Sequence, residues 1–298
     1  MRTLVLALLL PICAYSQQGE GSPSVYNEWK NKTLVIITYP DNKMVNATLK
    51  EVAEERWQGK KIETVAYADT KTLKGRKDIV ILKLGYYTSY GMPIISISTD
   101  LKSELFTNSS DGWAYATIPK IAGLDTKAEK KLLYKKIKNN PVIDGLVNLR
   151  HASAEKIKLI TNSLFNTTDK FKAGEYEFKF ARKSHTTFTK QQLDILKSKT
   201  LLISKNSFLK GVKEEDIKSN YTGKLKFVTE DQLKNHIAEN SKTTVYLSIA
   251  WEASVMVYSI IDLETSEVIY SNVQQPKAGN TYNGVFINMV KNLSDITQ

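Results

Sequence analysis

The sequence predicts a mixed α/β protein of two tandem, related modules, each with the element order β-α-β-α-β-β-β-α. Three observations lead to this prediction. A Lys-Thr-Leu phrase that opens an apolar run occurs at 32–37 and again at 199–203. After each occurrence, strand-like and helix-like periodicities alternate in the same order. Parallel strands joined by helices and extended by an antiparallel hairpin give a mixed sheet in each half. Chance similarity between two lysine-rich α/β segments remains the alternative.

The elements of the first module follow from apolar spacing and from turn residues. An apolar run over 33–38 predicts a buried strand, and helical spacing over 44–57 predicts a helix that Gly59 ends. Alternation over 62–68 predicts a second strand, Asp69 caps a short helix over 69–74, and 79–87 is a third strand. A hairpin around 103–106 and an amphipathic helix over 126–138 complete the module.

The second module repeats this order from 201 onward. Strands are expected at 201–204, 225–229 and 244–251, with helices at 212–219 and 230–238 between them. In this alignment Leu82 and Tyr86 correspond to Leu247 and Trp251. A hairpin over 260–270 and a helix over 282–293 close the second module.

The expected domain organisation has five parts. Residues 1–16 form a signal peptide, because Arg2 precedes a short apolar stretch that ends in the small residues Ala14 and Ser16. Residues 17–24 form a flexible polar leader, 25–139 the first module, 140–197 a basic and partly helical connecting segment, and 198–298 the second module. The chain is therefore expected in the periplasm or outside the cell after cleavage near Ser16.

Cysteine and charge limit the chemistry further. Cys13 is the only cysteine and lies within the expected signal peptide, so the mature chain contains no disulfide. A lipid anchor at Cys13 is disfavoured, because no small residue precedes it. The formal net charge is +11, which favours an anionic partner such as an acidic polymer. A solvated, lysine-rich surface explains the same charge without a partner.

Motifs for catalysis or cofactor binding are missing from the sequence. The expected first strand-to-helix turns, 39–43 and 205–210, contain no glycine, which argues against a nucleotide-phosphate site there. The three histidines, His151, His185 and His236, lack a third ligand nearby in the sequence. The sequence therefore predicts no cofactor, no metal and no identified catalytic residue.

The hairpin 260–270, of sequence IIDLETSEVIY, followed by a closing helix resembles the end of the small α/β modules in bacterial envelope proteins of the TolB amino-terminal and curli-export type. The resemblance covers about 100 residues per module. It concerns element order alone and transfers no functional residue. The chain lacks the propeller repeats and the membrane-spanning hairpins of those families. The resemblance implies an interaction or assembly module of the envelope.

Two groups of residues are candidate binding sites. The first comprises residues at the ends of the third strands, where ligands gather in open α/β sheets: Tyr86, Tyr87, Tyr90, Trp251 and Glu252. The second comprises lysines on the expected helix 126–138: Lys127, Lys131 and Lys135. The aromatic residues could instead pack against the following hairpin, and the lysines could form a solvated helix face.

The sequence therefore predicts an exported, non-enzymatic envelope protein that binds a protein or an anionic polymer. Scarce arginine argues against nucleic acid as that partner. No membrane segment is expected after signal cleavage, and the sequence leaves the oligomeric state open. The alternative is a hydrolase or a small-ligand-binding protein with its site in the cleft between the two modules.

Overall fold

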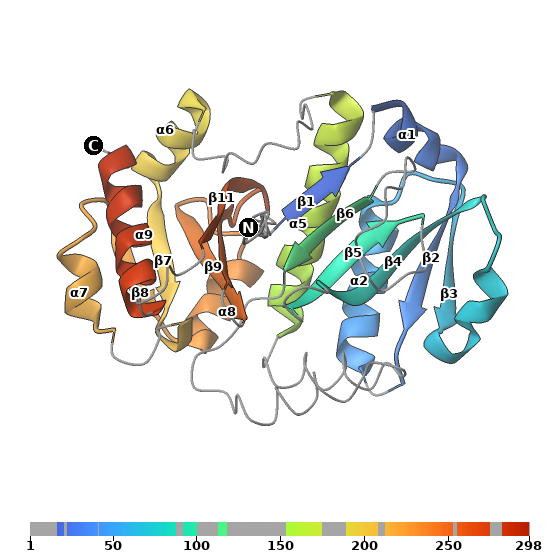
Figure 1. Cartoon of the computed structure of the whole chain (residues 1–298), viewed down its shortest axis with the longest axis horizontal. Coiled ribbons are helices and arrows are strands. Elements are labelled where there is room, and N and C mark those ends of the chain that lie inside the picture. Colours follow the sequence, from blue (N-terminus) through green and yellow to red (C-terminus); the bar gives the residue numbers. More distant parts are fainter. Residues whose placement is uncertain are drawn as a thin grey trace, which may run out of the picture.

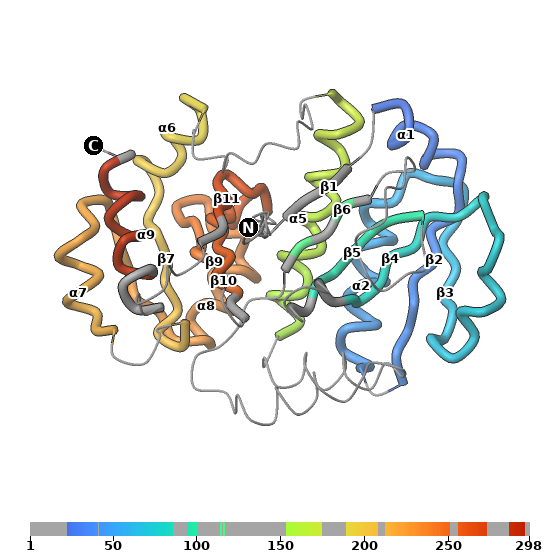
Figure 2. The backbone as a smooth tube through the Cα atoms, viewed as in Figure 1, coloured from blue at the N-terminus to red at the C-terminus, as the bar shows by residue number. Residues whose placement is uncertain are grey.

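The computed structural model places two β-sheets side by side along the long axis of the molecule, with one long helix between them (Figure 1). It describes residues 17–20, 23–40, 42–87, 92–99, 113–117, 153–174, 189–207, 212–252, 255–274 and 282–297. Figure 2 follows the same backbone as a tube. The mixed α/β class predicted from the sequence is confirmed.

The first sheet has six strands in the order β1-β6-β5-β4-β2-β3. The central strand β2 runs parallel to β3 and β4, whereas β5, β6 and β1 add antiparallel pairs. The strands are β1 (Gln17–Glu20), β2 (Thr33–Thr38), β3 (Lys61–Ala66), β4 (Ile79–Tyr87), β5 (Met92–Ser98) and β6 (Trp113–Thr117). Because β2 is buried on both faces, its sequence is a continuous apolar run rather than an alternating one.

The second sheet has five strands in the order β11-β10-β9-β7-β8. Here β7 runs parallel to β8 and β9, and β10 and β11 follow as antiparallel neighbours. The strands are β7 (Thr200–Ser204), β8 (Leu225–Val228), β9 (Thr244–Glu252), β10 (Val255–Asp262) and β11 (Val268–Gln274). Apart from β1, the two sheets share strand order and strand direction.

The register of the two sheets also corresponds. Val35 lies between Glu63 on β3 and Ile81 on β4, and its side chain is fully buried. Leu202, also fully buried, lies in the same way between neighbours on β8 and β9. In the antiparallel part, Leu82 pairs with Ile97 as Leu247 pairs with Ile260. The two central strands therefore have equivalent surroundings.

Helices cover the sheets. The longer ones are α2 (Lys43–Arg56), α5 (Ala154–Ala173), α6 (Lys190–Ser198), α8 (Glu230–Ala238) and α9 (Tyr282–Thr297). The shorter ones are α1 (Pro23–Glu28), α7 (Glu214–Lys218) and the 3-10 segments η1 (Trp29–Asn31), η2 (Tyr67–Leu73) and η3 (Lys205–Ser207). In the first half α5 packs against α1 and α2, as α9 packs against α6 and α7 in the second.

The structure differs from the sequence-based prediction at the amino terminus. A flexible leader is expected over 17–24, whereas Gln17–Glu20 forms the edge strand β1, paired with β6. A strand added at a sheet edge is held by backbone hydrogen bonds, so it can form without apolar side chains and its sequence does not predict it.

A second difference concerns the helix of the first half that corresponds to α9. The sequence predicts this helix at 126–138, which lies outside the described residues. In the structure α5, from the expected connecting segment, packs in the first half as α9 packs in the second. The residues expected to match the start of β11, 103–106, also lie outside the described part, and the strand in the place of β11 is β6. None of the described helices combines the length and the apolar character needed to cross a bilayer.

Candidate functional site at the junction of the two sheets

The junction between the two sheets is built on helix α5. Ser153 caps its amino terminus, since the Ser153 side chain accepts a hydrogen bond from the Lys156 backbone N–H. Gly174, at φ +73°, ends the helix in the left-handed conformation that glycine adopts without strain. These two local signals define a twenty-residue helix.

Different faces of α5 belong to different hydrophobic cores. Ile157, Ile160 and Leu164 are buried in the core of the first sheet. Leu159 instead packs in a cluster of the second half, whose other buried members are Leu202, Val228, Leu233, Ile237, Tyr246, Ile261 and Leu263. One helix therefore contributes apolar side chains to both halves of the molecule.

The threonine and serine residues of α5 can be buried because their hydroxyls form hydrogen bonds with backbone carbonyls of the same helix. The Thr161 hydroxyl donates to the Ile157 carbonyl at 2.7 Å, and the Thr167 hydroxyl donates to the Ser163 carbonyl at 3.0 Å. Such hydrogen bonds to a preceding turn remove the cost of burying a hydroxyl. They allow α5 to be enclosed on several sides despite a sequence rich in threonine and serine.

A buried polar cluster joins the amino-terminal end of α5 to the second sheet. The Lys156 ammonium forms an ion pair with Glu230, the first residue of α8. The Ser204 hydroxyl, at the carboxyl end of β7, donates to the other carboxylate oxygen of Glu230. The Asn206 backbone N–H in turn donates to the Ser204 oxygen at 3.2 Å. Only 3% of Lys156 and none of Ser204 is exposed.

The electrostatics of this cluster depend on burial. Burial lowers the pKa of Lys156, and the charge and hydrogen bond of Glu230 oppose this effect. Glu230 is also stabilised by its place in the first turn of α8, where the helix dipole favours a negative charge. Burial likewise raises the pKa of Tyr246, and the charge of Glu230 adds to the effect. The cluster is thus a paired set of charges in a largely dry environment.

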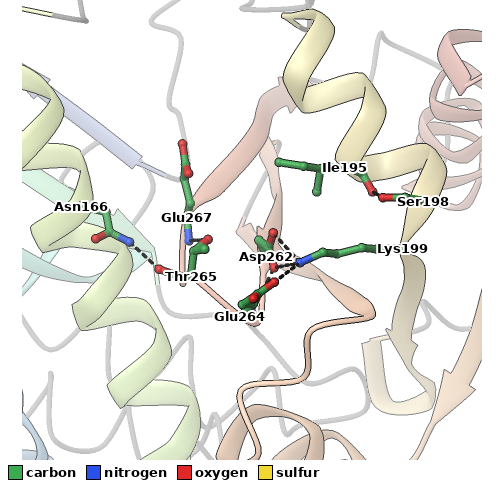
Figure 3. A network of polar contacts seen from close by, with 8 residues as sticks. All are labelled: Asn166, Ile195, Ser198, Lys199, Asp262, Glu264, Thr265 and Glu267. Atoms are coloured by element: carbon green, nitrogen blue, oxygen red, sulfur yellow. Dashed lines mark hydrogen bonds and ion pairs between the residues drawn. The ribbon is translucent and has the colours of Figure 1, made fainter.

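The carboxyl-terminal half of α5 contacts the turn between β10 and β11. The Asn166 side-chain amide donates to the Thr265 carbonyl at 2.8 Å (Figure 3). Lys170 forms an ion pair with Glu267 in the same turn. Together with the pair formed by Lys156, these contacts attach α5 to the second half near both of its ends.

The same turn is held on its other side by Lys199, which directly precedes β7. The Lys199 ammonium lies 2.8 and 2.9 Å from the two carboxylate oxygens of Asp262 and 3.0 Å from Glu264 (Figure 3). Burial alone would lower the pKa of Lys199, but hydrogen bonds to both carboxylates outweigh it, so the pKa is raised. The turn therefore links β7 to α5.

This arrangement is suited to holding the two halves together rather than to turnover. A serine hydrolase of the Ser-Lys type requires an accessible hydroxyl that donates to the base. Here the Ser204 hydroxyl donates to Glu230, and the Lys156 ammonium is paired with the same carboxylate. Within the described residues, no group of three His, Cys, Asp or Glu side chains could hold a metal ion.

The residues predicted as binding candidates are only partly described. The backbones of Tyr86 and Tyr87 lie at the end of β4, and those of Trp251 and Glu252 at the end of β9. Tyr86 pairs with Pro93 and Trp251 with Met256, so the two aromatic residues hold equivalent positions. Tyr90 lies outside the described residues, as do Lys127, Lys131 and Lys135.

Sequence reasoning did not identify the junction residues. Lys156 and Glu230 are 74 residues apart, and nothing in their local sequence relates them. The available signal was weaker: Thr229 and Gln232 form a capping box, which places Glu230 at the first position of a helix. Comparisons of the chain with protein families, with characterised proteins and with solved structures find no match.

Proposed function

We propose that this protein is an exported, non-enzymatic binding protein of the bacterial envelope, made of two copies of one α/β module that α5 holds as one body. Equal strand order, strand direction and register in the two sheets support the common origin of the modules. A rigid pair of modules presents two related surfaces in a fixed arrangement, which suits an extended protein or anionic polymer as the partner.

The non-enzymatic proposal rests on one observation: the polar groups at the amino-terminal end of α5 are largely buried and paired with one another. Among the described residues, the buried ionisable and nucleophilic groups at the amino-terminal end of α5 are Lys156, Glu230 and Ser204, and they are paired with one another. Catalysis requires at least one such group to reach a substrate. Their burial supports a joint that maintains the relative position of the modules.

Export is supported by the expected cleavage near Ser16. Cleavage there leaves β1, which begins at Gln17, intact as the first strand of the mature chain. The intact mass of the chain recovered from the periplasm or the culture medium tests this proposal. A mass corresponding to the uncleaved chain in the cytoplasm would contradict it.

The alternative, a hydrolase with its site between the modules, is favoured by one observation: Ser204 lies beside a lysine and a carboxylate at that location. A fluorophosphonate probe and a panel of aryl esters test it on the mature chain. We expect no labelling of the wild type and the same result for Ser204→Ala. Labelling that disappears in Ser204→Ala would establish the hydrolase and refute the binding protein.

A further inference from the structure

Lysine occupies equivalent positions at the amino-terminal edges of both sheets. Equivalence follows from the strand registers, in which Thr33 pairs with Lys61 and Ile79, Thr200 pairs with Thr244, and Leu201 pairs with Leu225. Continuing the last register by one residue places Lys224 opposite Thr200, as Lys61 is opposite Thr33. The four equivalent lysine pairs are Lys30 and Lys197, Lys32 and Lys199, Lys61 and Lys224, and Lys77 and Lys242.

Backbone hydrogen bonds bring the strand starts, and hence these lysines, together. In the first sheet the Thr33 N–H donates to the Asp78 carbonyl at 2.9 Å, and the Lys60 N–H donates to the Lys32 carbonyl at 3.1 Å. In the second sheet the Thr200 N–H donates to the Thr243 carbonyl at 2.8 Å. Residues that are distant in sequence therefore form one cluster at each edge.

The two clusters lie on the same side of the molecule. Helix α1, with η1, directly precedes β2, and α6 directly precedes β7. Both helices lie at the top of the view in Figure 1, so the parallel strands of both sheets start from that side. A single extended molecule can therefore reach both clusters.

Most of these charges are available to a ligand. Within the described part of the chain, no ion pair involves the following six lysines: Lys30, Lys32, Lys77, Lys197, Lys224 and Lys242. All of them are exposed except the half-buried Lys32. The remaining two are paired, Lys61 with Glu63 and Lys199 with Asp262 and Glu264. Each edge therefore retains several uncompensated positive charges.

The chemistry of the edges favours a carboxylated polymer over nucleic acid. All eight positions are lysine, a compact point charge that makes no fixed two-pronged contact with an anion, so the edges suit a linear polyanion rather than one precisely positioned phosphate. Binding of single-stranded nucleic acid also depends on exposed aromatic side chains for base stacking. Among the described residues, the exposed large apolar side chains are Met44 and Tyr67, which follow the opposite ends of β2 and β3.

We propose that the amino-terminal edges of the two sheets form one surface that binds a linear acidic polysaccharide across both modules. This inference rests on the proposed function as a binding protein and specifies its partner. Each edge contributes weak, screened contacts, and the fixed arrangement of the two edges makes the second contact intramolecular. Affinity should therefore rise steeply once the chain of sugars spans both edges.

The test uses the mature full-length chain and polygalacturonate as the probe. The edge variant replaces Lys30, Lys77, Lys197 and Lys242 by glutamine. A matched control variant removes the same charge at four exposed lysines on helices or beyond the opposite ends of the strands: Lys43, Lys50, Lys71 and Lys291. We expect the edge variant to bind at least about tenfold more weakly than the wild type, because both linked contacts are lost. The control variant should stay within about twofold, since distant exposed charges are screened.

A second measurement tests whether one polymer spans both modules. Trigalacturonate carries only three carboxylates, so we expect it to bind one edge at a time and much more weakly than the polymer. Replacing the lysines of a single edge should remove most of the affinity for the polymer while leaving trigalacturonate binding at the other edge. Circular dichroism and thermal unfolding establish that each variant is folded.

Several outcomes would overturn the inference. One is an equal loss of polygalacturonate affinity in the edge and control variants. Another is tighter binding of double-stranded DNA or of anionic phospholipid vesicles than of polygalacturonate through the same lysines. A folded chain that binds a protein of the envelope but no polyanion also overturns it and leaves the proposed binding function intact. Serine hydrolase activity, in contrast, refutes the proposed function itself.

Discussion

Replacing Lys156 by methionine should destabilise the protein strongly, because it leaves Glu230 without its partner at the junction. The Lys156 side chain is 4% exposed and that of Glu230 is 17% exposed, so water replaces little of the lost interaction. Removing one partner of a buried ion pair costs about 3–5 kcal/mol. Ser204 still donates to Glu230, and the α8 dipole still favours its charge. We therefore expect a loss near the lower end, about 3 kcal/mol.

Lys158 provides a matched control on the same helix. It pairs with Glu51 and Glu55 of α2, but its side chain is 39% exposed, and exposed pairs contribute at most about 1 kcal/mol. Urea unfolding of Lys156→Met and Lys158→Met gives the comparison directly. The double variant Lys156→Met/Glu230→Gln should lose less than the sum of the two single variants, with a coupling of about 1–3 kcal/mol. Equal effects of the two lysine variants would refute the assignment of Lys156 to a buried joint.

Three further predictions concern the same region. Leu159→Ala should cost about 2–5 kcal/mol in urea unfolding, because it opens a cavity between α5 and the second sheet, and a loss below about 1 kcal/mol would contradict that packing. The pKa of Lys199 is raised in the folded state, so its stabilising contribution is complete below its unfolded pKa of about 10.4 and is lost as the pH rises through the folded value. The difference in unfolding free energy between the wild type and Lys199→Met should therefore be constant from about pH 7 to 10 and decrease above pH 10. An increase of this difference above pH 10 would contradict a raised pKa of Lys199 in the folded state. Ser266 has φ +57°, so Ser266→Gly should stabilise the turn by about 1 kcal/mol, whereas a loss in thermal unfolding would count against backbone strain there.

The central strands could be predicted because their signals are local. Apolar runs fix β2 and β7, and the Leu82–Leu247 correspondence seen in the sequence agrees with the strand registers of the structure. The capping residue Thr189 similarly accounts for the start of α6. In each case a few neighbouring residues are sufficient, because burial and capping act over one or two turns.

The remaining features depend on contacts between distant parts of the chain. The sequence does not predict β1, because this strand has no apolar pattern and is held by backbone hydrogen bonds to β6. The segment 140–197 is predicted only as partly helical, because Thr161, Thr167 and Thr168 interrupt the apolar pattern of α5, although each hydroxyl forms a hydrogen bond within the helix. The junction cluster requires Lys156 and Glu230 to meet across 74 residues, which only the assembled fold achieves.

The two halves differ where α5 joins them. Ile37 and Ser204 hold equal register positions, opposite Val65 and Val228 in their sheets. Two residues beyond those valines, the first half has Tyr67 and the second has Glu230.

In the first half, the Tyr67 ring stacks on Tyr39 with ring centroids 5.8 Å apart, whereas in the second half Glu230 forms an ion pair with Lys156. Among the described residues, this strand end therefore has an ammonium–carboxylate pair in the second half and two stacked aromatic rings in the first. The carboxyl ends of the parallel strands therefore differ between the two halves, whereas four lysines occupy equivalent positions at each amino-terminal edge. If the modules share one ancestor, the feature that both retain is the better guide to a shared role, which is why the lysine edges, rather than the buried serine, are the place to look for the ligand.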